Sequence, residues 1–180
     1  MNLEVVHLKP VLLEICDMPS ASAGTTIKHI HYYLNRVEIP HVIISEHNIA
    51  DIVRHLQSSF QQVDVVLCEH GLFDCLTMLR YYYLEHHISP EDYTLFANAY
   101  LNSVFTKYSN YVLLMNDSNL ELLYPQYSLA KQDCLCLYEN SFKGIQQIDT
   151  KGLPPKAVTA TAVSSIIDFL KNEQPSRCTN

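Results

Sequence analysis

Positively charged residues are scarce in this sequence, and arginine above all. The chain has 12 Lys and Arg residues against 19 Asp and Glu residues, which gives a formal net charge of −7. Its arginines are Arg36, Arg54, Arg80 and Arg177. Because duplex binding depends on many contacts from Lys and Arg to phosphates, this composition argues against nucleic acid as a partner.

The sequence also lacks the patterns of a zinc site, a secretory signal and a membrane span. No two of its six cysteines form a C-x-x-C pair. No basic segment followed by an apolar one opens the chain, and no apolar run approaches the roughly 20 residues of a membrane helix. We therefore expect reduced thiols in the cytoplasm and no association with a membrane.

The size and apolar content of the chain predict a single domain. It has 180 residues, of which 48% are hydrophobic and 17% charged, enough for one full core. We expect this domain to span residues 1–171. The polar tail 172–180 is expected to be disordered.

Short apolar runs alternate with segments of helical periodicity. Strands are predicted at 10–16, 41–45, 63–68, 111–115 and 145–148. Helices are predicted at 25–36, 49–58, 73–85, 90–107 and 156–171, with Ser89 as an N-cap and Asp92 at the third helical position of the fourth. This alternation implies βαβ crossovers, and so a three-layer α/β/α fold with a five-stranded parallel sheet.

Polar residues follow three of the predicted strands. In sheets of this kind, ligands bind outside the carboxyl ends of the strands. Strand one is followed by a Pro, Ser, Ala and Gly loop at 18–26, strand two by Glu46, and strand three by Glu69 and His70. These segments are therefore the candidate functional site.

The loop at 18–26 has the spacing of a phosphate-binding loop without its chemistry. Such a loop requires Gly-x-x-x-x-Gly-Lys-[Ser/Thr] between a strand and a helix. In this register Met18 and Ala23 replace the two glycines, Gly24 replaces the lysine, and Thr25 keeps the hydroxyl. The loop keeps its predicted place between a strand and a helix, but the positively charged lysine is lost.

The chain as a whole resembles the P-loop nucleoside and nucleotide kinases, with thymidylate kinase and the deoxynucleoside kinases most alike. The resemblance rests on the element order and on two altered motifs, P-S-A-S-A-G-T-T after strand one and C-E-H-G-L-F-D after strand three. It covers residues 9–171. It implies a P-loop NTPase-like fold, with ATP and Mg²⁺ as the cofactors if the site still works.

The resemblance also implies a set of nucleotide-binding positions. They are Pro19, Ser20, Ala21, Ser22, Ala23, Gly24, Thr25, Thr26 and Lys28. Thr25 would be the Mg²⁺ ligand, if nucleotide binds, and Lys28, one helical turn beyond Gly24, could replace the missing lysine.

Three cationic positions of the family are altered. Gly24 stands for the loop lysine, and His70 stands for the arginine of the family's Asp-Arg motif. The lid expected at 119–139 contains Lys131 and no arginine. Because phosphoryl transfer depends on positioning and charge stabilisation, efficient ATP-dependent catalysis is not expected.

Acidic groups of the family remain. Glu46 matches in place the carboxylate that takes a proton from the substrate hydroxyl, although it could equally be a solvated loop residue. Glu69 and His70 could form a catalytic pair or a structural cap. These three are the candidate catalytic residues.

The sequence leaves three functional hypotheses. The first is a degenerate, pseudokinase-like protein that binds nucleotide weakly or not at all and regulates a protein partner, or a second copy of itself. The second is an active nucleoside or nucleoside-monophosphate kinase with an atypical loop. The third is another phosphate-ligand enzyme, with Glu69 and His70 as acid and base.

Overall fold

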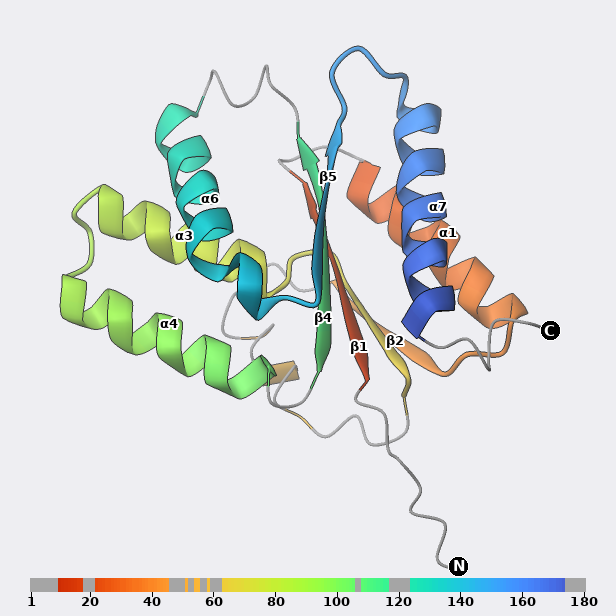
Figure 1. Cartoon of the computed structure of the whole chain (residues 1–180), viewed down its shortest axis with the longest axis horizontal. Helices are drawn as coiled ribbons and strands as arrows, with labels where there is room; N and C mark the ends of the chain where they lie inside the picture. Colours follow the sequence, from red (N-terminus) through yellow and green to blue (C-terminus); the bar gives the residue numbers. More distant parts are fainter. Residues whose placement is uncertain are drawn as a thin grey trace, which may run out of the picture.

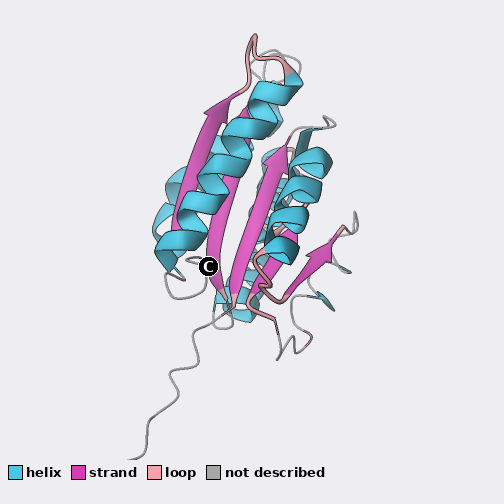
Figure 2. Ribbon diagram, turned by 90° about the vertical axis from the view of Figure 1, so that its right-hand side faces the viewer, coloured by secondary structure: helices cyan, strands magenta, loops and turns pink. Residues whose placement is uncertain are grey.

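The computed structural model describes residues 10–17, 22–45, 51, 54–55, 58, 63–105, 108–116 and 124–173. These residues form the predicted three-layer α/β/α fold (Figure 1). Its strands are β1 (Val11–Asp17), β2 (His41–Ile44), β3 (Val65–Cys68), β4 (Ser109–Asn116) and β5 (Gly144–Asp149). Every neighbouring pair is parallel, so the strand arrows run the same way in Figure 2.

The helices cover both faces of the sheet. They are α1 (Ser22–Arg36), α3 (Leu72–Leu84), α4 (Pro90–Phe105), α6 (Pro125–Tyr138), the short 3-10 helix η1 (Glu139–Ser141) and α7 (Pro155–Glu173). One face carries α1 and α7, and the other carries α3, α4 and α6 (Figure 1). None of the helices in the described ranges is long and apolar enough to cross a membrane.

The central strand β1 belongs to both layers of the core. Side chains alternate across a strand, so Val11, Leu13 and Ile15 pack toward α1 and α7. Leu12 and Cys16 pack toward α3 and α6. A strand of a parallel sheet is buried on both sides, which explains why this segment is a nearly continuous apolar run.

The sheet order is β2-β3-β1-β4-β5. β1 therefore pairs with β3 on one side and with β4 on the other. After β1 the chain enters α1 on one face, and after β3 it enters α3 on the opposite face (Figure 1). The carboxyl ends of β1 and β3 thus form a topological switch point, the place where open α/β sheets bind ligands.

The boundaries of the predicted elements in the described residues agree with the structure to within two residues, except at the start of α1, and one further α-helix is present. α1 begins at Ser22, three residues before the predicted start, and α7 continues to Glu173, so residues 172–173 of the predicted tail are helical. α6 was not predicted, because the segment was treated as a polar lid. Most of the helix predicted at 49–58, and the tail 174–180, lie outside the described residues.

Candidate functional site

The candidate site lies at the switch point, where the first turn of α1 meets the segment that follows β3. We define the switch-point site as Gly24, Thr25, Glu69, His70 and Gly71. α1 carries the first two residues, and the β3–α3 connection carries the other three. Gly24 of the first sequence motif and Glu69 of the second are therefore brought together in space.

The first turn of α1 contains five of the residues predicted to bind nucleotide. Ser22, Ala23, Gly24, Thr25 and Thr26 are helical here, not part of the preceding loop. Their backbone N–H groups lie at the positive end of the helix dipole, which attracts anions.

The side chains of this turn divide between solvent and core. Thr25 is exposed, whereas Thr26 is fully buried. Lys28 is exposed one turn further along the helix. Among the described residues of this turn no side chain carries a positive charge, since residue 24 is glycine.

Glu69 lies beside Gly24, the position that the family resemblance assigns to the loop lysine. A Cβ atom placed on Gly24 would lie 3.3 Å from Glu69 Oε1. Because the Cα–Cβ bonds of a helix tilt toward its N-terminus, this contact places the carboxylate beside the first turn of α1. The site thus presents an acid where a phosphate-binding loop presents an ammonium group.

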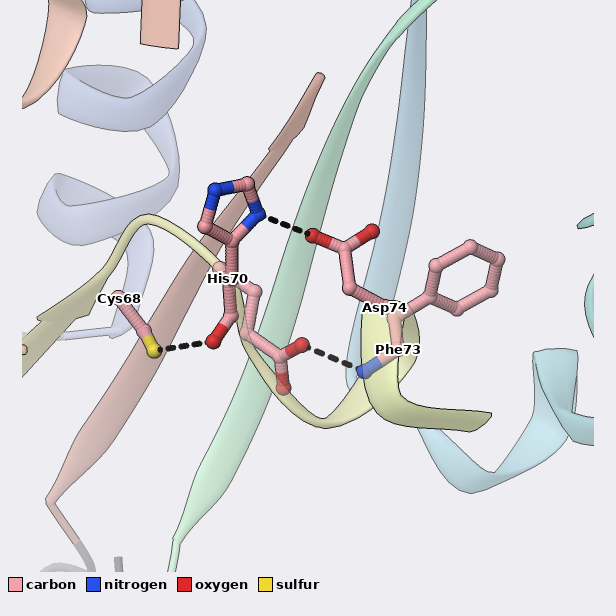
Figure 3. A network of polar contacts seen from close by, with 5 residues as sticks. Cys68, His70, Phe73 and Asp74 are labelled. Atoms are coloured by element: carbon pink, nitrogen blue, oxygen red, sulfur yellow. Dashed lines mark hydrogen bonds and ion pairs between the residues drawn. The ribbon is translucent and has the colours of Figure 1, made fainter. Parts of the chain in front are cut away.

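His70 is held by an acid that sequence reasoning missed. Its Nδ1 lies 3.2 Å from Oδ2 of Asp74, one turn into α3 (Figure 3). The same carboxylate oxygen would attract a protonated imidazole, and it fixes the orientation of the ring. The i, i+4 spacing of His70 and Asp74 at a helix start was the available signal.

Glu14 contacts the segment that follows β3, and the sequence analysis did not predict this contact. It lies in the middle of β1 and is fully buried, and its Oε2 accepts the backbone N–H of Phe73 at 2.7 Å. Gly71 packs directly against this carboxyl group, because a Cβ at residue 71 would lie 2.2 Å from Glu14 Oε2. A lone acid inside a buried apolar strand was the signal that could have found it.

Burial sets the acidity of Glu14. Burial away from water raises its pKa to about 8. The negative charge of Asp74 raises this pKa further, whereas backbone hydrogen bonds from Phe73 and Leu72 lower it. In the folded protein this side chain is therefore largely a neutral carboxylic acid near pH 7.

Buried thiols surround Glu14. Burial raises the pKa of the Cys16, Cys68 and Cys75 thiols well above the ordinary value. The Cys68 thiol donates to the backbone oxygen of His70 at 3.0 Å (Figure 3). Neutral thiols are poor metal ligands and nucleophiles, so this cluster is part of the core.

The described part of the segment that the sequence predicts as a lid, residues 124–139, carries a buried lysine. Lys131 of α6 is buried, and its Nζ donates to Oδ1 of Asn116 at the end of β4. Arg80 of α3 instead points to Asp133, with 2.6 Å between Nη2 and Oδ2. The segment 119–139 contains no arginine. In the structure it is helical from Pro125 to Tyr138.

Several predicted site residues cannot be placed. Glu46 and the loop residues Pro19, Ser20 and Ala21 lie outside the described residues. The structure therefore brings together Gly24, Thr25, Glu69 and His70. The proposed roles of these four residues remain predictions.

The described side chains fit a magnesium nucleotide poorly. Thr25 offers one hydroxyl oxygen of the kind that Mg²⁺ accepts, but the place of the phosphate-binding lysine faces the Glu69 carboxylate. Within the described ranges, no group of three or more His, Cys, Asp and Glu side chains could hold a metal ion. The five-stranded parallel sheet is compatible with a P-loop NTPase. No protein-family model matches the chain, and no curated protein matches it.

Proposed function

We propose that this protein is a degenerate relative of the P-loop nucleoside and nucleotide kinases that binds nucleotide weakly or not at all. It acts through protein contacts, as a regulator or partner subunit. The observation that carries this proposal is the placement of Glu69 against Gly24, with 3.3 Å between Oε1 and the Cβ position.

The charges of the site support a loss of phosphate binding. A phosphate at the first turn of α1 would meet the Glu69 carboxylate in place of an ammonium group, and like charges repel. The same carboxylate already interacts favourably with the positive end of the α1 dipole. Phosphoryl transfer consists mainly of positioning and cationic stabilisation, so the reversed sign at this position removes its main driving force.

Two cations near this edge of the sheet are engaged with protein groups. Lys131 binds Asn116, and Arg80 pairs with Asp133. Recruiting either of them to a phosphate would require breaking its contact. This supports a protein that no longer depends on phosphoryl transfer.

Thermal unfolding with Mg²⁺ and ATP tests the proposal. The wild type and Gly24→Ala should unfold at the same temperature with and without ATP. Gly24→Lys restores an ammonium group beside Glu69 and should gain a response to ATP. A shift of several degrees in the wild type that Thr25→Ala or a chelator abolishes would contradict the proposal.

Exposed apolar side chains support the part of the proposal that concerns protein contacts. On α4, Leu95 is 64% exposed and Phe96 is 42% exposed, and on α6, Leu129 and Leu137 are also exposed. We expect sedimentation to show self-association or binding to a purified partner, which the double substitution of Leu95 and Phe96 to Ser would weaken. A strict monomer that binds no partner would count against this role.

A second candidate function is acid–base catalysis on another phosphate-containing ligand. The contact between His70 and Asp74 favours it, because a carboxylate that orients an imidazole is a common catalytic arrangement. Its test is hydrolysis of a panel of phosphate esters by the wild type and His70→Gln. Equal rates for both proteins would exclude His70 as the acid or base.

A further inference from the structure

The carboxyl group of Glu14 is the buried ionisable group that the fold least explains. Glu14 is 0% exposed, and among the described residues its Oε1 has no hydrogen-bond partner. Its Oε2 accepts the N–H of Phe73, and the backbone of Leu72 also contributes a hydrogen bond to the carboxyl group. A buried polar atom without a partner costs stability, so a purely structural role would be filled better by an apolar side chain.

The surroundings of Glu14 connect it to the switch-point site. The backbone of Gly71 lies against the carboxyl group, where a Cβ would stand 2.2 Å from Oε2 and 2.4 Å from Cγ. Phe73, whose N–H the carboxyl accepts, lies in the first turn of α3. Glu14 therefore holds the end of the segment Glu69–Gly71 and the start of α3 against the centre of the sheet.

We infer that Glu14 links proton binding to the conformation of the segment Glu69–Gly71. The neutral acid holds this segment and the start of α3 against β1, and the ionised acid loosens them. The reason is that a carboxylate has two oxygens to solvate, and Oε1, which has no hydrogen-bond partner among the described residues, gains a donor when water enters the core beside it. This inference goes beyond the proposed function and does not depend on it.

Among the described residues, the titratable groups that face Glu14 come from α3, β1 and β3. From α3 come Asp74 and Cys75, from β1 comes Cys16, and from β3 comes Cys68. The three thiols have raised pKa values, so they stay neutral while Glu14 ionises. On β4 the residue beside Glu14 is Val112, which carries no charge. Within the described part of the chain, Asp74, the partner of His70, is thus the acid whose charge acts on Glu14.

The direction of the pH effect follows from linkage. Burial raises the pKa of Glu14 from 4.5 to about 8, so the folded state holds this proton more tightly than the unfolded chain. The stabilisation is complete below pH 4.5 and is lost as the pH rises toward 8. Ionisation of this single group should raise the unfolding equilibrium constant by roughly several hundred-fold between pH 5 and pH 8.

The first experiment compares urea unfolding of the wild type and Glu14→Gln from pH 5 to pH 9. Gln has nearly the same size and keeps an oxygen for the Phe73 N–H, but it cannot ionise. We expect the unfolding constant of the wild type to rise much more steeply with pH than that of Glu14→Gln. Parallel profiles for the two proteins would overturn the inference. Glu69→Gln is the matched control, and it should keep the wild-type slope.

The second experiment observes the segment directly. The amide resonances of Gly71 and Phe73 should change with a midpoint near pH 8 in the wild type, in step with the ¹³C carboxyl resonance of Glu14. Asp74→Asn removes a like charge and should lower that midpoint. These spectra need only the wild type if Glu14→Gln does not fold. A Glu14 carboxyl that titrates below pH 6, or Gly71 and Phe73 amides that do not follow it, would overturn the inference.

Discussion

At the scale of single residues, the glycines at positions 24 and 71 occupy very different environments. The Cβ position of Gly24 lies 3.3 Å from the end of the Glu69 side chain, which can rotate aside. The Cβ position of Gly71 lies 2.2 Å from Glu14 Oε2, in the middle of the sheet, where nothing can move freely. The same substitution should therefore have opposite effects at the two positions.

Gly71→Ala should lower the free energy of unfolding by about 2 kcal/mol, the usual cost of overpacking a filled core. Gly24→Ala should be neutral or raise it by up to about 1 kcal/mol, because Ala favours helix over Gly. Urea unfolding measures both. In the double variant Gly71→Ala with Glu14→Ala, the loss should be smaller than the sum of the two single losses, and strict additivity would contradict the steric explanation.

Glu14 and Asp74 contact the site but could not be predicted as its neighbours from the sequence. Glu14 was counted as part of a strand, because its partner Phe73 is 59 residues away in the chain and only the folded sheet brings them together. Glu69 is predicted as a site residue by its position after β3, and that role stays a prediction. Its contact with Gly24 could not be predicted, because it depends on how α1 and the β3–α3 segment pack.

At the scale of elements, the strands and most helices could be predicted and α6 could not. A buried parallel strand is a short apolar run, which can be recognised in the sequence alone. The predicted N-cap Ser89 is confirmed, because its Oγ accepts the Asp92 N–H at 3.1 Å. In α6 the buried residues are Ala130, Lys131 and Cys134. A small residue, a charged residue and a thiol do not form a recognisable apolar stripe, so the segment resembled a polar loop.

α6 is joined to α3 and α4 by a cluster centred on Arg80. This guanidinium contacts Asp133 of α6 through two nitrogens, at 2.9 and 2.6 Å, and it lies over the rings of Tyr83 and Tyr93. Both nitrogens donate to the same oxygen, Oδ2, and the pair is partly buried, so it should be stronger than an ordinary surface pair.

A double-mutant cycle on Arg80→Met and Asp133→Asn should give a coupling of about 1 kcal/mol in the free energy of unfolding. Methionine keeps much of the contact with the two tyrosine rings, so the cycle isolates the charge pair. Urea unfolding at low and high salt is the measurement. A coupling free energy of zero at low salt would show that the contact between Arg80 and Asp133 does not stabilise the fold.

At the scale of the whole molecule, one sheet separates two cores. Leu12 lies in the core under α3 and α6, and Leu13 lies in the core under α1 and α7. Both side chains are at most 1% exposed. The two cores share every strand, so the domain should unfold as one unit.

Leu12→Ala and Leu13→Ala should each lower the free energy of unfolding by about 2 to 5 kcal/mol, as expected for a buried leucine that leaves a cavity. The two losses should appear in a single transition whether unfolding is followed by far-ultraviolet circular dichroism or by tyrosine fluorescence. Two separate transitions would show that the helical layers on the two faces unfold independently.

The close fit between Gly71 and Glu14 constrains the order in which this protein can change over generations. A lineage that first acquired a side chain at position 71 would lose stability at once, since the carboxyl group fills that space. A lineage that first replaced Glu14 with a smaller residue would vacate the space and free position 71 to vary. Divergent descendants should therefore lose the acid before, or together with, the glycine.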